Sequence, residues 1–176
     1  MKLFGMKNMI RAALCAALCV VLPMAFHAIP NAGSVILPMH IPVLLCGLIC
    51  GWPWGFLCGL IGPALSSLLT GMPPAAILPA MMVECCTYGL VAGIMIALVK
   101  TKHRMANLYI SLVTAMIVGR IVAGAAKALI FAVGEFGFAM WATGYFVTGL
   151  PGIIIQLALL PLVVVALEKA RVITPR

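Results

Sequence analysis

The stretch HIPVLLCGLICGWPWGFLCGLIGPALSSLLT, residues 40–70, decides the fold, because it sets how many times the chain crosses a membrane. As one helix, its 31 residues would be about 46 Å long, well beyond the roughly 30 Å hydrocarbon core of a bilayer. Trp52 and Pro53 interrupt the stretch near its middle. We therefore expect two short, glycine-rich helices over 40–52 and 54–70 that meet at this point.

A ladder of glycines runs through the same stretch. Gly47, Gly51, Gly55 and Gly59 recur at every fourth position. In lipid, small residues at this spacing let the backbones of neighbouring helices approach closely. We expect the ladder to pack against other helices of the same chain.

The rest of the chain has the composition of a membrane protein. Of its 176 residues, 65% are hydrophobic and 8% are charged, and the mean hydropathy is +1.27. Soluble domains are roughly half apolar and about a quarter charged, so a soluble globular domain is excluded, and a disordered chain more firmly. The apolar runs predict an all-α integral membrane protein, a bundle of six transmembrane helices forming one domain over 1–176. Its spans are expected at about 9–29, 40–52, 54–70, 75–99, 107–133 and 140–167.

The charges are strongly unbalanced. Eleven Lys and Arg face three Glu, with no Asp, for a net charge of +8. In a soluble protein this excess of basic residues would suggest a nucleic-acid partner. In a membrane protein it reflects the orientation of the chain in the membrane, because cytoplasmic loops are rich in Lys and Arg. With six spans and both termini cytoplasmic, nine of the eleven basic residues fall inside. A single span over 40–70 would instead place the basic residues of 100–104 outside. Six spans with both ends inside are therefore predicted, and no nucleic-acid partner.

The N-terminal region resembles a signal peptide, since basic residues precede an apolar run that starts at Ala12. The run continues to about Ile29 without a clean small-x-small cleavage site, so a retained first helix is expected. All seven cysteines lie in apolar runs, which argues against a disulfide framework. No His or acidic residue completes a soft-metal site beside the cysteine pairs at i, i+4, so neither a metal nor a cofactor is expected.

Three ionisable residues lie inside the predicted spans, and intramembrane charges are candidate functional residues by default. Glu84 and Arg120 are expected at matching depth, about 21–23 Å from the cytoplasmic edge, on consecutive antiparallel helices. They can form a structural ion pair or line a ligand site. Lys127 follows seven residues after Arg120 on the same helix face. Its amine can snorkel outward, reach Glu135 or meet an anionic ligand.

Further polar and aromatic residues are expected around this column of charges near the outer face. Tyr88 lies one helical turn from Glu84, while Trp141 and Tyr145 are either interface anchors or walls of a binding site. A few placed polar groups with aromatic walls suit a small polar molecule captured from outside. Ser34 and Gln156 are candidates to complete the polar lining. The predicted substrate-binding residues are Asn31, His40, Glu84, Tyr88, Arg120 and Lys127.

The residue sets of common catalytic chemistries are missing from the sequence. Without Asp, no Ser/His/Asp triad can be assembled, and Glu84 has no second intramembrane carboxylate. No HExxH motif or phosphate-binding glycine loop is present. We therefore expect no enzyme and no ATP site. A stand-alone channel or ion-coupled transporter, and an intramembrane enzyme using Glu84 and His40, are the alternatives.

Residues 37–43, LPMHIPV, and residues 46–55, CGLICGWPWG, follow a first helix with overlapping Ala-xxx-Ala faces. With the six expected spans, these runs resemble the S components of energy-coupling factor (ECF) transporters. The resemblance covers nearly the whole chain and is strongest between residues 35 and 95. It implies a high-affinity binder of a vitamin or related micronutrient in the bacterial cytoplasmic membrane.

The resemblance also implies partners and the place of the ligand. Such a subunit carries no ATPase and docks on a transmembrane T component driven by two cytoplasmic ATPases, which alone use ATP. The ligand would bind near the outer face, where the column of charges is expected. The docking residues that the resemblance implies are Ala12, Ala13, Ala16 and Ala17.

The ligand itself stays open at this stage. Two basic groups against one buried acid favour an anion, such as a carboxylate-bearing vitamin of the pantothenate or folate kind. If Glu84 neutralises Arg120, a zwitterion or a heterocyclic base recognised by Glu84 fits as well.

Overall fold

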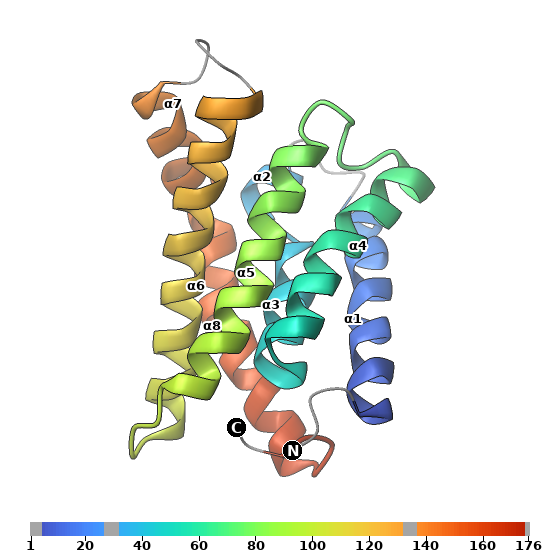
Figure 1. Ribbon diagram of the computed structural model, residues 1–176, viewed down its shortest axis with the longest axis vertical. Helices are drawn as coiled ribbons and strands as arrows, with labels where there is room; N and C mark the ends of the chain where they lie inside the picture. The colour runs from blue at the N-terminus through green and yellow to red at the C-terminus, as the bar shows by residue number, and fades with distance from the viewer. Residues whose placement is uncertain (1–4, 27–31, 132–136, 175–176) are drawn as a thin grey trace.

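The computed structural model describes residues 5–26, 32–131 and 137–174, and these form a bundle of helices joined by short connections (Figure 1). The described parts contain no strand. In chain order the elements are α1 (Met6–Ala25), α2 (Ala32–Ile36), α3 (His40–Cys50), α4 (Trp52–Thr70), α5 (Leu78–Leu98), α6 (Arg104–Ala126), the π-helical segment η1 (Lys127–Phe131), α7 (Phe138–Ala142), the π-helical segment η2 (Thr143–Thr148) and α8 (Leu150–Lys169).

Six helical stretches in the described parts are long and apolar enough to cross a membrane, which confirms the predicted six-helix bundle. Each provides at least 18 residues, the length at which a helix begins to match the bilayer core. They are Met6–Ala25, Gly33–Cys50, Trp52–Thr70, Leu78–Leu98, Arg104–Ile130 and Leu150–Lys169.

The break within residues 40–70 occurs at Gly51, one residue before the expected junction. Gly51 adopts φ 98°, a backbone conformation that favours glycine because it has no Cβ. Its N–H donates to the carbonyl of Gly47 and closes α3. Pro53 then lies in the first turn of α4, where a missing N–H costs no helical hydrogen bond. The proline therefore begins the second helix, and the glycine makes the break.

The glycine ladder packs within the chain, against α5. A Cβ on Gly55 or Gly47 would overlap the carbonyl group of Gly89, and one on Gly59 would overlap the backbone of Cys85. The backbones of α4 and α5 thus touch with no side chain between them, as small-residue interfaces in membranes allow. Helix α3 packs on both α4 and α5, so the three helices form one closely packed unit.

Two π-helical segments lie between α6 and α8. The expected span over 140–167 is divided into α7, η2 and α8, with Gly149 capping the start of α8. Helix α6 likewise ends in a π-helical turn that begins at Lys127. π-Helical turns are rare and occur frequently at functional sites.

The two ends of the bundle differ in charge. The start of α1, the connection from α5 to α6 and the end of α8 lie at one end (Figure 1). There the guanidinium of Arg11 donates to the carbonyl of Val172, and Arg104 forms an ion pair with Glu168. Lys100 and Lys102 lie in the α5–α6 connection at the same end. The bundle therefore has one basic end, opposite the end that holds α2 and α7.

Candidate ligand-binding cavity

A cavity of about 720 Å³ is lined by residues of α2 and α7 and so lies at the end of the bundle that holds them. Its wall is built from the end of α1, from α2 and the turn into α3, from the α4–α5 connection, and from α5, α6, η1, α7 and η2. This volume falls within the range of roughly 300–1,000 Å³ that small-molecule sites occupy. Segments distant in sequence thus converge on one concave site.

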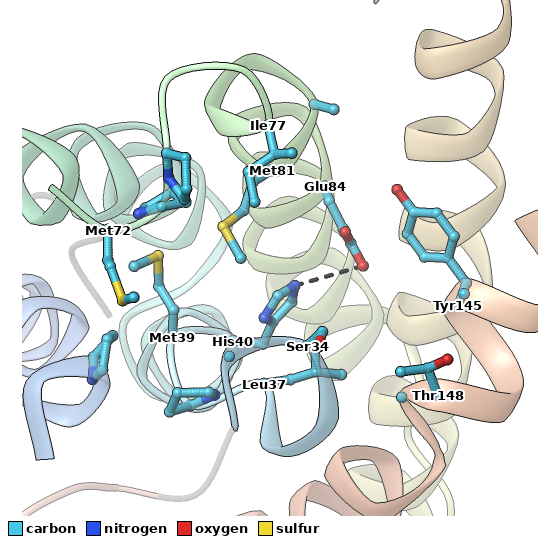
Figure 2. A pocket seen from close by; sticks show the side chains of 18 of the residues that line it. Ser34, Leu37, Met39, His40, Met72, Ile77, Met81, Glu84, Tyr145 and Thr148 are labelled. Carbon is cyan, nitrogen blue, oxygen red and sulfur yellow. Dashed lines mark ion pairs between the residues drawn. The ribbon is translucent and has the colours of Figure 1, made fainter. Parts of the chain in front are cut away.

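His40 and Glu84 face each other in this wall. His40 begins α3, Glu84 lies on α5, and the His40 Nε2 atom is 3.5 Å from Glu84 Oε1 (Figure 2). This separation meets an ion-pair distance but not hydrogen-bond geometry. Neither ring nitrogen of His40 has a hydrogen-bond partner in the described part of the chain, although the residue is 0% exposed. Buried polar atoms are normally satisfied, so these nitrogens are candidates to meet a ligand.

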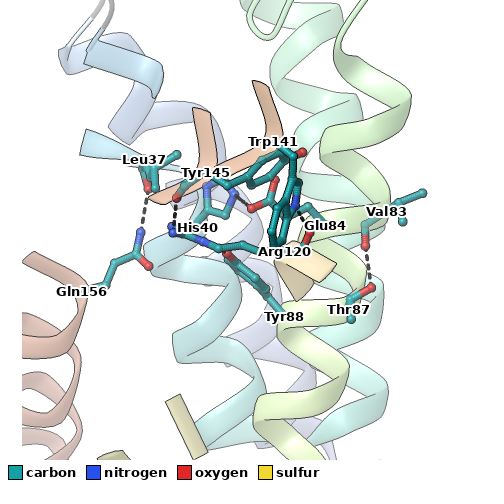
Figure 3. Close-up of polar contacts among 10 residues, drawn as sticks. All are labelled: Leu37, His40, Val83, Glu84, Thr87, Tyr88, Arg120, Trp141, Tyr145 and Gln156. Atoms are coloured by element: carbon teal, nitrogen blue, oxygen red, sulfur yellow. Dashed lines mark hydrogen bonds and ion pairs between the residues drawn. The ribbon is translucent and has the colours of Figure 1, made fainter. Parts of the chain in front are cut away.

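Arg120 is buried beside this pair and contacts neutral oxygens. Its Nε donates to the Tyr88 hydroxyl at 2.9 Å, and its Nη1 donates to the backbone carbonyl of Tyr145 (Figure 3). The indole Nε1 of Trp141 donates to the Arg120 carbonyl at 3.0 Å. Arg120 is 2% exposed. The guanidinium is thus held in place by the hydroxyl of α5 and the backbone of η2.

The ion pair considered between Glu84 and Arg120 does not form in the structure. The two residues do lie near the same end of antiparallel helices, as the helical rise predicts. Tyr88, one turn along α5 from Glu84, reaches the guanidinium instead, and Glu84 contacts His40. The helical rise relates the positions of the two residues along their helices, but the rotation of each side chain about its helix axis selects the partner.

Lys127 lines the cavity from the first position of η1. Its Nζ lies 5.4 Å from the centroid of the Tyr145 ring, a cation–π distance. Tyr145 belongs to η2. The next residue of η2, Phe146, has its ring centroid 5.4 Å from the guanidinium carbon of Arg120. η2 therefore contacts both cations, one through each of two consecutive aromatic rings.

The structure brings most of the predicted binding residues together. His40, Glu84, Arg120 and Lys127 all line the cavity, and so do Ser34 and Tyr145. Tyr88 is 0% exposed and supports the guanidinium of Arg120. The centroid of its ring lies 5.2 Å from the centroid of the His40 ring. Gln156 donates to the carbonyl of Leu37, and Trp141 holds the backbone of Arg120. Asn31 lies outside the described residues.

The apolar residues of the cavity wall were not predicted from the sequence. Met39, Met72, Ile77 and Met81 lie on one side of the cavity, and Glu84, Tyr145 and Thr148 lie on the other, with His40 between them (Figure 2). Helical spacing could have indicated Met81, which precedes Glu84 by three residues on α5. Met72 lies in the connection after α4, where no periodicity indicates a direction.

The four alanines of α1 that were predicted to dock differ in exposure. Ala12 is 7% exposed and belongs to the core, and Ala16 is half-buried against it. All four line an apolar groove of about 630 Å³ between α1 and α4, and Ala13 and Ala17 are the exposed pair. Only Ala13 and Ala17 are therefore fully exposed on the surface of the bundle.

The cysteines are all buried free thiols. Cys19 Sγ of α1 lies 4.0 Å from Cys58 Sγ of α4, where both pack between the helices. Within residues 5–26, 32–131 and 137–174, no three His, Cys, Asp or Glu side chains are arranged to hold a metal ion.

The family model described as "ECF transporter, substrate-specific component" matches residues 7–164 of the chain. The match begins at the first turn of α1 and ends within α8, so it includes every described segment that lines the cavity. No curated protein and no solved structure matches the chain.

Proposed function

Because the chain belongs to the family of substrate-specific components of ECF transporters, we propose that it captures a vitamin or related micronutrient and delivers it to an ATP-driven importer. Family members are transport components rather than enzymes. The observation that supports capture is the cavity of about 720 Å³, in which His40 presents two buried nitrogens that no described residue satisfies. A water-soluble ligand can pair with such groups and recover the cost of their desolvation.

The proposed orientation places the cavity at the outside of the bacterial cytoplasmic membrane. Lys7, Arg11, Lys100, Lys102 and Lys169 all belong to the end opposite the cavity (Figure 1). Basic residues collect on the cytoplasmic side of membrane proteins. Both termini are then cytoplasmic, and the ligand enters from the outer face.

The proposed partners are a transmembrane T component and two cytoplasmic ATPases. The family resemblance assigns docking to the alanine faces of the first helix, and the surface exposure favours Ala13 and Ala17. Small side chains there permit close approach of a partner helix, as in other helix pairs within lipid. Ala12 belongs to the core and is proposed to support α1 rather than to touch the partner. ATP is used only by the partner subunits.

The test begins with the isolated chain. We expect the protein, purified in detergent without any step to remove ligand, to carry a vitamin-like molecule in near-equal amount, identified by mass spectrometry. Uptake of that molecule in cells should require co-expressed T component and ATPases. An empty protein that binds no member of a vitamin panel would contradict capture. Flux into liposomes that contain the purified chain alone would instead establish a stand-alone transporter or channel.

A further inference from the structure

We infer that the ligand of this cavity is an amphipathic organic anion, with its anionic group at Arg120 and Lys127 and its apolar body along the methionine-lined wall. This inference rests on the proposed function and assigns the chemical class of the captured molecule. Three features of the cavity carry it: a buried cation, the balance of charges and the separation of polar from apolar lining.

The first feature is the guanidinium of Arg120. It is 2% exposed, and in the part of the chain that the structure describes both of its acceptors are neutral oxygens, from Tyr88 and Tyr145. The recorded contacts use Nε and Nη1, and no described acceptor contacts Nη2 (Figure 3). A buried charge without a counter-ion is unfavourable, and an anionic ligand would offset this cost. The planar fork of Arg is well matched to a carboxylate.

The second feature is the balance of charge around the cavity. Arg120 and Lys127 are cations, while Glu84 is the only carboxylate among the described lining residues. Glu84 is also paired with His40 rather than with either cation. The described lining therefore carries more basic than acidic side chains, and Arg120 is the one that is buried. A cationic ligand would have to enter against this field, whereas an anion is attracted by it.

The third feature is the separation between polar and apolar lining. Met39, Met72, Ile77 and Met81 occupy the side away from Tyr145 and Thr148 (Figure 2). Methionine is flexible and polarizable, so this wall adapts to an apolar body of irregular shape, including an aromatic or sulfur-containing one. His40 lies between the two sides, where its ring nitrogens can pair with a polar group in the middle of the ligand.

The experiment compares acids with their neutral counterparts. The full chain in detergent is titrated with biotin and biotinamide, lipoate and lipoamide, pantothenate and pantothenol, and nicotinate and nicotinamide, by calorimetry and thermal shift. Within each pair the compounds differ in the charged group. We expect at least one acid to bind at least tenfold more tightly than its neutral partner, because its charge-assisted hydrogen bonds are lost in that partner.

Variants assign this preference to the cavity. Arg120→Gln should abolish the tenfold preference, and Arg120→Lys should keep part of it by keeping the charge. Arg104→Gln is the matched control, because Arg104 lies on the same helix at the opposite end of the bundle and should leave binding unchanged. If Arg120→Gln does not fold, Lys127→Gln provides the comparison, and should weaken acids without weakening neutral compounds.

Each outcome is decisive. If a neutral compound or a base binds as tightly as the tightest-binding acid, the anion assignment is overturned. The proposed capture function would still hold in that case. If no acid in the panel binds, the charge of the co-purified molecule at neutral pH decides: an anion supports the assignment, and a neutral or cationic molecule overturns it. If nothing binds and nothing co-purifies, both the assignment and the capture function are contradicted.

Discussion

The hydroxyl of Tyr88 accepts a 2.9 Å hydrogen bond from Nε of Arg120, and this contact joins α5 to α6 beneath the cavity. The tyrosine ring also packs edge-on against His40. One side chain therefore supports both Arg120 and His40 of the candidate site at the same time.

Replacing Tyr88 with Phe should remove this support and little else. The ring keeps its packing, but a buried donor of Arg120 loses its acceptor, at a cost of about 1–3 kcal/mol in the free energy of unfolding. We expect a lower midpoint of thermal unfolding for the purified protein. Tyr109→Phe, at a residue of α6 that is 41% exposed, is the control and should match the wild type. Equal stability of the two variants would contradict the role given to Tyr88.

The contact between α4 and α5 should not tolerate even one added methyl group. In Gly89→Ala, the new Cβ overlaps the backbone of Gly55, so the helices must separate. We expect aggregation or loss of the monodisperse peak in size-exclusion chromatography. Gly137→Ala introduces the same methyl group where no atom lies within 4 Å, and it should behave as the wild type. A monodisperse, normally stable Gly89→Ala would show that the close approach is dispensable.

The exposed alanine face of α1 should be needed for transport but not for binding. Ala13→Trp fills the groove beside α4, so uptake in cells with the partner subunits should fall at least tenfold. The isolated variant should keep its ligand affinity, measured by calorimetry. Leu14→Trp, at a 64% exposed neighbour outside this groove, is the control for bulk in the lipid-facing surface. Loss of ligand binding together with uptake would argue against docking through Ala13.

The ion pair at the basic end should contribute stability without affecting the cavity. Arg104 and Glu168 join α6 to α8, with side chains 24% and 10% exposed. We expect a coupling energy of about 1 kcal/mol or less from a double-mutant cycle of Arg104→Gln and Glu168→Gln, since partial exposure screens the pair. Lys169→Gln, at an exposed neighbour, should show no coupling with Arg104→Gln. A coupling energy of zero for the first pair would mean that it is only a surface contact.

Hydropathy predicted the six helices because each span is an apolar run of at least 18 residues. Their fine structure depends on information that hydropathy lacks. Gly51 rather than Pro53 makes the break, because positive φ is a backbone property and proline is compatible with a first turn. The π-helical turns at Lys127 and Thr143 have no composition of their own, so the sequence does not indicate them.

The candidate site was predictable in location and partly in membership. Intramembrane charge identified Glu84, Arg120 and Lys127, since ionisable residues are rare inside lipid. Their partners were not predictable, because the helical rise gives the depth of a residue and not the direction of its side chain. His40 reaches Glu84 from the first residue of α3, a relationship between helices that only their packing determines.

The backbone contact between Gly55 and Gly89 has a consequence for how the specificity of such a protein can change. The contact between α4 and α5 depends on the absence of side chains, so its glycines cannot be replaced without separating the two helices. The cavity wall is instead made of separate side chains, such as Met39, Met72 and Thr148, on segments outside that contact. Replacement of wall residues can therefore change which substrate such a protein binds while the helices that carry the wall keep their packing.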